Sequence, residues 1–283
     1  MPSKIIQKLS ELSQVVNDAR GANRSIGVVP TMGALHAGHV SLAQTAVEQS
    51  DITIATIFVN PTQFAAGEDL EQYPRTLDAD VEQLSQVGID YVFAPQPAEI
   101  YPDGFSTSVD PPKVSQSLEG EHRPTHFCGV ATVVLKLLNM TGADKAFFGQ
   151  KDYQQLLVVR QMVKDLNVRC EIVACPIVRD EDHLALSSRN RYLSAEERQQ
   201  ALALNRTLKL AESLIRDGEQ DTHVIMNEMK QSLIDGGVDS IDYAMVANAD
   251  DLTIPDEIKL PVVCLLAAHV GTTRLIDNCV IQD

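Results

Sequence analysis

Two histidines, His36 and His39, stand three residues apart in the string PTMGALHAGH, which begins at Pro30. An apolar run precedes this string and the amphipathic segment SLAQTAVEQS follows it, so the pattern predicts a turn between a buried strand and a helix. Gly33 and Gly38 would let a ligand approach the backbone, and the helix start offers N–H groups to a phosphate. Imidazoles at this spacing can face one side and donate hydrogen bonds to phosphate oxygens. The turn therefore predicts a phosphate-binding site.

Two other readings of the histidine pair carry less weight. The pair could be incidental to a tight turn, which is a fair description of many H-x-x-H strings. It could also bind a metal, but no third ligand stands at a recognisable zinc spacing. The buried strand and the two glycines favour phosphate binding over both.

Polar residues follow two more predicted strands. VNPTQF, residues 59–64, places Asn60 and Gln63 beyond one strand end, where uncharged amides suit the hydroxyl groups of a ligand. FFGQKDYQQ ends an apolar strand at Gly149 and starts a helix with Lys151 and Asp152. The lysine can reach phosphates, while the aspartate can cap the helix or hold ribose hydroxyls. Taken alone, a solvated lysine or a surface glutamine would be the more ordinary interpretation.

A polar segment, LALSSRNR, offers two hydroxyls followed by a guanidinium, at Ser187, Ser188 and Arg189. These groups can bind the β- and γ-phosphates of a nucleotide, although a Ser/Arg-rich linker is more often a solvated loop. The charged string LEGEHRPTHF, residues 118–127, leaves both possibilities equally open: a functional loop or a solvated connection.

The elements that would position these residues alternate along the first part of the chain. Short β-branched runs at 25–31, 52–59, 91–95, 145–149 and 171–178 predict five strands. Helical periodicity lies between them at about 38–50, 76–88, 126–141 and 153–167. This order predicts βαβ units and a doubly wound, Rossmann-like α/β domain over residues 1–176, with ligands beyond the carboxyl ends of its strands. The helix at 126–141 is apolar nearly all round, which suits a core or a dimer contact.

After residue 176 the pattern changes. Ser194 and Glu197 form a capping-box pattern that opens a long helix to about Asp217, and a second helix follows from about 222 to 234. Three strands come next, and the last two are joined at Gly271 in a possible hairpin. The sequence thus predicts a smaller α+β domain over residues 177–283.

Composition excludes several classes of protein. The 283 residues carry a net charge of −16, which opposes binding to nucleic acid or to an anionic membrane. The longest apolar run, LPVVCLLAAHV, is about half the ~20 residues that a membrane span needs. The five cysteines are scattered without a C-x-x-C pair, and no signal peptide is visible. We expect a protein of the cytoplasm with reduced thiols.

The ordered strings narrow the function further. PTMGALHAGH, VNPTQF, YPRTLDAD, LEGEHRPTHF, FFGQKDYQQ and SSRNRYLS follow one another over nearly the whole chain. H-x-G-H resembles the signature of the nucleotidyltransferase superfamily, and the six strings together resemble the pantothenate synthetase family. That resemblance implies ATP-dependent condensation of pantoate with β-alanine through an enzyme-bound pantoyl adenylate, releasing pyrophosphate and AMP. It also implies a homodimer and a requirement for Mg2+, for which Asp78 and Asp80 are weak candidate ligands.

The resemblance also assigns roles to residues of this sequence. His39, His36, Lys151 and Arg189 would be catalytic, with His39 donating a hydrogen bond or proton to the phosphates. Gln63, Gln155 and Asn60 would bind pantoate and β-alanine. The residues implied in ATP binding are Met32, Gly33, Ala34, Leu35, His36, Ala37, Gly38, His39, Gly149, Gln150, Lys151, Asp152, Val178, Leu186, Ser187, Ser188 and Arg189.

Several positions depart from the family pattern, and two other functions remain open. Cys128, Thr125, Gln150 and Ala79 stand where arginine, glycine, glutamate and an acidic residue are frequent, and His183 stands where glycine is common. An adenylyltransferase of the same fold, acting on another small acid or a phosphate acceptor, is the nearest alternative. A nucleotide-binding regulator without catalysis is a third, which the intact phosphate donors disfavour.

Overall fold

The computed structural model describes residues 2–65, 67, 68 and 70–282 and divides into two compact units. The first comprises the chain up to Gly149 together with Gln154–Pro176. The second comprises Gln150–Tyr153 together with the chain from Ile177 onward. The short stretch Gln150–Tyr153, which the sequence analysis assigned to the first domain, thus packs with the second unit.

The first unit is built on a parallel sheet, as the sequence predicts. Within the described residues it has six strands in the order β1-β4-β3-β2-β5-β6. Their bounds are β1 Lys4–Ile6, β2 Ile26–Thr31, β3 Ile52–Ile57, β4 Tyr91–Phe93, β5 Lys145–Gly149 and β6 Glu171–Cys175. The five expected strands are confirmed. The predicted strands did not include β1, which pairs with β4 through Ile5 and Val92.

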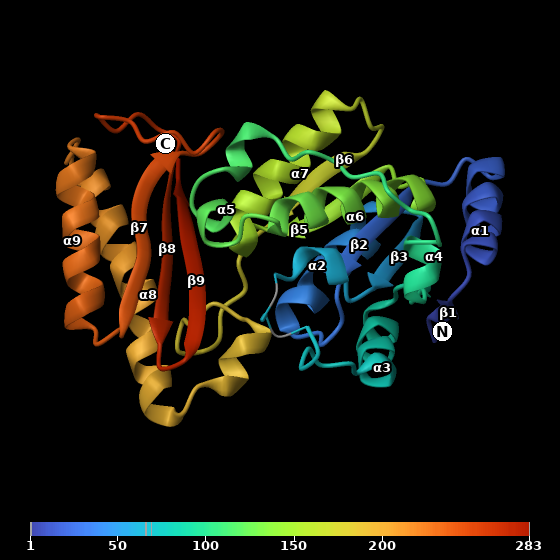
Figure 1. The fold of residues 1–283 in the computed structure, drawn as a ribbon, viewed down its shortest axis with the longest axis horizontal. Coiled ribbons are helices and arrows are strands. Elements are labelled where there is room, and N and C mark those ends of the chain that lie inside the picture. Colours follow the sequence, from blue (N-terminus) through green and yellow to red (C-terminus); the bar gives the residue numbers. More distant parts are fainter. Residues whose placement is uncertain (1, 66, 69, 283) are drawn as a thin grey trace. The chain divides into compact units, whose positions relative to one another are not determined.

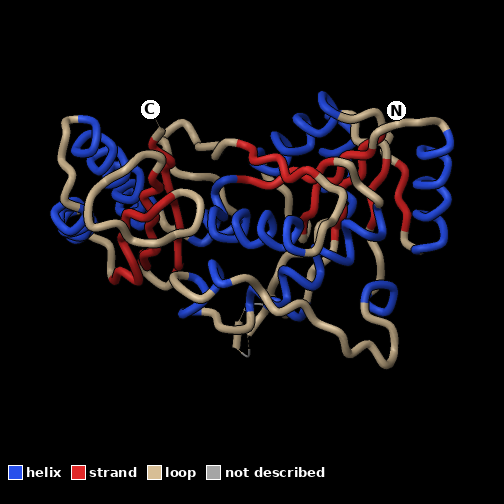
Figure 2. Tube along the Cα trace, turned by 90° about the horizontal axis from the view of Figure 1, so that it is seen from above, coloured by secondary structure: helices blue, strands red, loops and turns tan. Residues whose placement is uncertain are grey.

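Helices cover both faces of this sheet (Figures 1 and 2). The principal ones are α1 Leu9–Gly21, α2 Ala37–Gln49, α3 Leu77–Val87, α6 His126–Thr141 and α7 Tyr153–Asp165, with short α4 Pro97–Ile100 and α5 Glu119–His122 between them. Short 3-10 turns lie at η1 Pro61–Gln63, η2 Lys113–Ser115, η3 Gln150–Asp152 and η4 Ser188–Tyr192.

Alternate residues of the central strands β2 and β3 enter different cores. Val28 of β2 packs in the core under α1, α6 and α7, whereas its neighbour Val29 packs in a core with Leu42 of α2. Ile54 and Ala55 of β3 divide in the same way. Burial on both faces explains why these strands read as continuous apolar runs. Helix α6 belongs to the first core, with most of its residues buried there, so its apolar surface serves the interior of this unit.

The direction of winding reverses at β2. This strand pairs with β3 on one side and β5 on the other. The chain winds outward from β2 through β3 to β4, and later from β5 to β6. Ligands of such sheets bind beyond the carboxyl ends of the strands at this reversal. Here those ends are Thr31 and Gly149, which directly precede the H-x-G-H turn and the Lys151 segment.

The second unit consists of an antiparallel meander with two long helices. Strands β7 Ser240–Asn248, β8 Val262–Val270 and β9 Thr273–Ile281 pair in order, and α8 Ala195–Arg216 and α9 Thr222–Asp235 pack against them (Figure 1). The predicted capping box is confirmed, since Ser194 N–H donates to Glu197 at 2.7 Å and Glu197 N–H donates to Ser194 Oγ at 3.2 Å. The β8–β9 hairpin turns at Gly271, as expected.

Each of the five cysteines lies within the described ranges and is a free thiol. Among the described residues, the helices are too short or too polar for any of them to span a membrane.

Candidate active site

The turn between β2 and α2 carries the H-x-G-H residues in an unusual backbone conformation. Gly33 (φ +85°) and Ala34 (φ +52°) both lie in the left-handed region, which alanine rarely adopts because its Cβ crowds the following carbonyl. The Thr31 hydroxyl accepts a hydrogen bond from Gly33 N–H at 3.2 Å. A Cβ added at position 33 would lie 3.1 Å from both Asp80 and Ile57. Protein atoms therefore fill the space beside this glycine. The left-handed backbone and the close approach of Asp80 and Ile57 together require glycine at this position.

Asp80, in the first turn of α3, holds the same turn from the other side. Its Oδ2 accepts a hydrogen bond from Ala34 N–H at 3.0 Å, and its Oδ1 accepts one from Leu35 N–H at 2.9 Å. The Thr76 hydroxyl donates to Oδ2 at 3.2 Å, and the side chain is 1% exposed. The sequence analysis considered Asp80 only as a weak magnesium ligand. Its contact with the turn joins residues 46 positions apart, which no local pattern announces.

His36 and His39 form a reciprocal cap at the start of α2. Nδ1 of His36 accepts from Gly38 N–H at 3.1 Å, and Nδ1 of His39 accepts from His36 N–H at 3.4 Å. The ring centroids are 4.2 Å apart. A ring nitrogen that accepts a hydrogen bond carries no proton, so each neutral imidazole bears its proton on Nε2. The cap thus fixes both rings as Nε2–H donors, which is the form that a phosphate oxygen can use.

Asn60 lies at the end of β3 and is saturated by the protein. It is 1% exposed; its Oδ1 accepts from the Tyr101 hydroxyl at 2.8 Å and the Thr62 hydroxyl at 3.0 Å. Its Nδ2 donates to the Gly129 carbonyl at 3.2 Å and to Gln63 Oε1 at 3.1 Å. This geometry supports a role in shaping the β3–η1 turn and in orienting Gln63.

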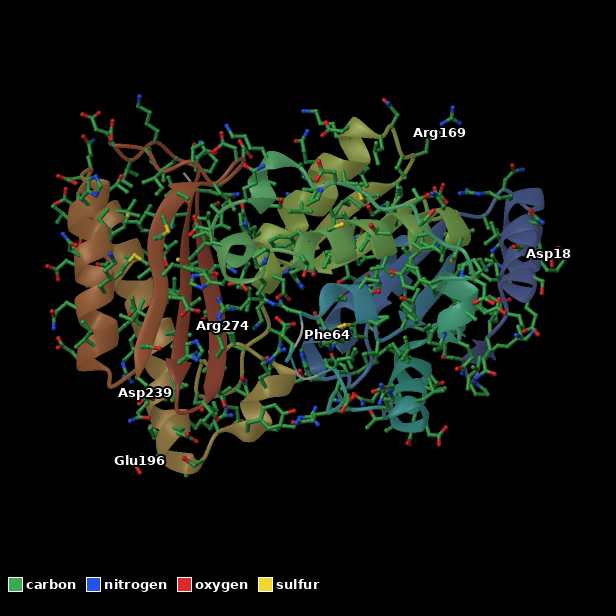
Figure 3. All side chains as sticks on the ribbon, in the orientation of Figure 1. Asp18, Phe64, Arg169, Glu196, Asp239 and Arg274 are labelled. Atoms are coloured by element: carbon green, nitrogen blue, oxygen red, sulfur yellow. The ribbon has the colours of Figure 1, made fainter. Side chains whose placement is uncertain are left out.

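Gln63 connects the η1 turn to the histidine turn. Its Nε2 donates to Met32 Sδ at 3.2 Å, and because a thioether is a weak acceptor, a ligand oxygen can replace it at little cost. Phe64, labelled in Figure 3, directly follows η1, and its ring lies edge-on to that of Tyr73 with 5.9 Å between the centroids. The structure therefore brings Gln63 and the Met32–His39 segment together at one end of the sheet.

A network of charged side chains supports η1. It includes residues of the 118–127 string, whose role the sequence alone did not decide. Arg123 donates to both Glu68 oxygens at 2.8 Å, and Nδ1 of His126 lies 3.0 Å from the Gln63 carbonyl. The Arg123 hydrogen bond holds the pKa of Glu68 below its usual value. Burial, together with the Arg123 charge, lowers the pKa of His126. This string is therefore a built support for the Gln63 backbone rather than a solvated connection.

The lowered pKa of His126 predicts a pH-dependent stability. Below its ordinary pKa of 6.5 the unfolded chain binds a proton that the folded unit resists, so the free energy of unfolding should fall as the pH drops from 7 to 5. His126→Asn, whose amide can still donate to the Gln63 carbonyl, should flatten that slope. Urea unfolding at several pH values measures it, and equal slopes for both proteins would refute the assignment.

Two adjacent glutamines at the start of α7 have different surroundings. Gln154 is 3% exposed, donates to the carbonyls of Ser117 at 2.7 Å and Val114 at 2.9 Å, and accepts from Glu119 N–H at 3.0 Å. It fixes the preceding loop, a role that sequence reasoning missed. Gln155, the predicted pantoate ligand, is half-buried at the next position, and its role stays a prediction.

In the second unit, Asn278 of β9 holds the Lys151 segment. Its Nδ2 donates to the Gln150 carbonyl at 3.0 Å and to the Lys151 carbonyl at 2.8 Å, and the side chain is 2% exposed. The Tyr153 hydroxyl donates to the Ala249 carbonyl at 2.9 Å. These contacts explain why Gln150–Tyr153 packs with this unit. No local pattern indicates these contacts, because Asn278 lies 128 positions from Gln150.

The predicted Ser-Ser-Arg residues form a short, capped turn. Ser187 Oγ accepts from Arg189 N–H at 3.2 Å at the start of η4. Just before it, Leu186 N–H donates to the Val178 carbonyl at 3.0 Å. The structure thus joins Val178 with the Leu186–Arg189 segment.

The loop before this turn is braced by ion pairs. Arg198 of α8 donates to Asp180 at 2.6 Å and to Asp182 at 2.7 Å. This bonding lowers the pKa of Asp182. Arg179 makes a two-pronged pair with Asp277 at 2.7 and 2.9 Å. The backbone before the serines is therefore held at both ends.

His183 occupies the strained position of that loop. Its φ is +72°, a conformation that glycine adopts without a Cβ penalty. A histidine in place of the family's common glycine therefore strains the backbone at this position. His183→Gly should raise the free energy of unfolding of this unit by about 0.5–1 kcal/mol, since relief of strain outweighs the added chain entropy. Thermal denaturation measures the change; a less stable variant would show that the imidazole itself contributes.

The described residues do not build a dedicated metal cage. None of their His, Cys, Asp and Glu side chains gather in a group of three or more that could hold an ion. Asp80 already accepts three hydrogen bonds from the protein, and Asp78 is exposed on α3. A magnesium ion in an ATP site commonly keeps several waters and is held mainly by the nucleotide phosphates.

Comparisons with known proteins cover nearly the whole chain. The family profile described as Pantoate-beta-alanine ligase matches residues 4–280. The pantothenate synthetase of Caldicellulosiruptor bescii is 46% identical over 278 residues, which cover 98% of this chain and 99% of the relative. That of Acetivibrio thermocellus is 46% identical over 279 residues and covers 99% of each chain.

Solved structures give the same result. The pantothenate synthetase of Thermus thermophilus superposes with a TM-score of 0.92 at 38% identity, over 99% of this chain and 100% of that one. The pantoate-beta-alanine ligase of Francisella tularensis, complexed with Beta-gamma ATP and Beta-alanine, has a TM-score of 0.81 at 34% identity, over 98% and 97%. The histidine turn, the ordered motifs and these relatives lead to one conclusion: the chain belongs to the pantoate-beta-alanine ligase family.

Proposed function

We propose that this ATP-dependent ligase joins pantoate to β-alanine in two steps through an enzyme-bound pantoyl adenylate. In the first step the pantoate carboxylate attacks the α-phosphate of ATP and pyrophosphate leaves. In the second, the amine of β-alanine attacks the activated carbonyl and AMP leaves, carrying the electron pair of the broken bond. Adenylation is needed because a bare carboxylate is a poor acyl electrophile.

The capped histidine pair is the observation that carries this proposal. Phosphoryl and adenylyl transfers depend on donors that hold the phosphates while negative charge spreads over their oxygens. His36 and His39 carry their protons on Nε2 because both Nδ1 atoms accept backbone hydrogen bonds. We assign them hydrogen-bond donation to the transition state; departure of pyrophosphate does not require a full proton transfer.

Neutral amides favour a hydroxy acid as the second substrate. Gln63 is oriented by Asn60 and lies against Met32, close to the histidine turn. An uncharged amide can both donate to and accept from the hydroxyls of pantoate. A phosphate-bearing acceptor would instead need cationic side chains around it, so the neutral amides near Gln63 disfavour the adenylyltransferase alternative. Gln155 is assigned as a second pantoate ligand.

Lys151 and the Ser187–Arg189 segment are assigned to the phosphates of ATP. Gly149 ends β5 next to β2, and Lys151 is only two residues further, about 7 Å of extended chain at most. Val178, Leu186 and the Gly149–Asp152 stretch are assigned to the rest of the nucleotide. Mg2+ would arrive with the triphosphate and supply additional neutralisation of its charge.

The remaining assignments concern the whole protein. We assign ATP and pantoate binding to residues 1–176 and a covering role to residues 177–283, which would exclude water from the reactive adenylate. We also propose a homodimer in the cytoplasm, which light scattering and cell fractionation can test.

AMP formation tests the proposed function directly. Purified protein with ATP and Mg2+ should release AMP only when both pantoate and β-alanine are present. An adenylyltransferase would not form AMP in this way, and a nucleotide-binding regulator would form little. AMP release at the same rate with and without β-alanine would overturn the proposed reaction.

A further inference from the structure

Asp80 is a buried charged residue that the mechanism above does not use. Its carboxylate is 1% exposed, yet the three hydrogen bonds it accepts come from two backbone N–H groups and a hydroxyl. A carboxylate is placed in such surroundings at a considerable desolvation cost. The residues that it holds, Ala34 and Leu35, immediately precede His36.

The backbone that Asp80 holds has a strained conformation. Ala34 has a φ of +52° directly after Gly33 at +85°, so two successive residues are left-handed. The N–H groups of Ala34 and Leu35 donate to the Asp80 carboxylate, whereas Gly33 N–H donates to the Thr31 hydroxyl. Only glycine visits this region freely. Hydrogen bonds from Ala34 and Leu35 to the two carboxylate oxygens offset the strain at Ala34.

The position of the histidines depends on this conformation. His36 begins the cap of α2, and its N–H donates to His39. If Ala34 relaxes to a right-handed or extended conformation, the chain enters the cap at a different angle and both Nε2–H donors move. A displacement of about 1 Å at reacting groups can lower a rate on the order of 10²-fold.

We propose that Asp80 is a positioning residue for adenylation: its carboxylate keeps the Gly33–Ala34 turn left-handed and thereby aims His36 and His39, instead of binding a metal. This inference rests on the proposed two-step reaction. Thr76, whose hydroxyl also reaches Oδ2, supports the same carboxylate.

Asp80→Asn provides the first test, because it keeps the shape but turns one acceptor into a donor that faces a backbone N–H. We expect the single-turnover rate of pantoyl adenylate formation to fall about 10- to 100-fold, while the half-saturating Mg2+ concentration stays unchanged. Supplied pantoyl adenylate should still react with β-alanine at a near-normal rate. Glu82→Gln, the same charge change at an exposed position of α3, is the matched control and should leave both half-reactions unchanged.

A double-mutant cycle separates positioning from general destabilisation. Ala34→Gly removes the Cβ penalty of the left-handed turn, so it should raise the adenylation rate of Asp80→Asn by about threefold or more relative to its effect in the otherwise unchanged enzyme. Circular dichroism and thermal denaturation confirm that each variant is folded. If Asp80→Asn does not fold, Thr76→Val, which removes one donor to the carboxylate, replaces it in the same cycle.

The outcomes that overturn the inference are distinct from failure of the proposed function. A raised Mg2+ requirement in Asp80→Asn would make the carboxylate a metal ligand. An equal effect of Ala34→Gly in both backgrounds, or an unchanged adenylation rate, would remove the link to the turn. The proposed function itself fails only if the unsubstituted enzyme and Glu82→Gln do not form AMP in a pantoate- and β-alanine-dependent reaction.

Discussion

His39→Ala should lower the rate of pantoyl adenylate formation by about 10² or more, in line with the loss of one preorganised donor to a developing negative charge. The structure separates two tasks of this side chain. Nδ1 accepts the His36 N–H at 3.4 Å and completes the cap, while Nε2 carries the proton assigned to the phosphates. Alanine removes both.

Two amide substitutions distinguish these tasks. In His39→Asn the side-chain oxygen can take the place of Nδ1 in the cap, but no donor reaches the Nε2 position. In His39→Gln the longer amide can place an N–H there. We expect Asn to be as slow as Ala and Gln to recover part of the rate, measured by pyrophosphate release in a single turnover. His223→Ala, an exposed histidine of α9, is the control. An unchanged rate in His39→Asn would leave the cap as the only role of this residue.

Lys151→Met should impair the first half-reaction by about 10² or more and spare the second, because a point charge on the phosphates matters only while ATP is being cleaved. Methionine keeps most of the length of lysine without its charge. The backbone carbonyl of Lys151 still accepts from Asn278 at 2.8 Å, so the segment should keep its place in the second unit.

The measurement is a pair of assays on one variant. Adenylate formation from ATP and pantoate should be slow, whereas supplied pantoyl adenylate and β-alanine should give AMP at a near-normal rate. Lys164→Met, an exposed lysine in the last turn of α7, should behave as the unsubstituted protein. Equal losses in both assays by a folded Lys151 variant would show that the lysine does not act on the triphosphate alone.

The agreement between the predicted and observed elements has a physical basis. Strands β2, β3 and β5 are largely buried on both faces, and helices such as α2 and α3 on one, so the local sequence carries the hydrophobic pattern of these elements. β1 was not predicted, because the Lys4–Ile6 strand depends on its pairing with β4, which lies far along the chain. The packing of Gln150–Tyr153 with the second unit was not predicted for a similar reason, since it depends on hydrogen bonds from Asn278.

By itself the sequence determined the alternation of strands and helices, the histidine turn and the family to which the chain belongs, because each depends on residue types at short spacing. Two further features are visible only in the folded chain. Asp80 holds the Gly33–Ala34 turn, and Asn60 orients Gln63 while donating a hydrogen bond to the Gly129 carbonyl. These contacts join positions 46 and 69 residues apart along the chain. A hydrogen bond requires its two atoms within about 3 Å, and folding alone brings such distant residues that close.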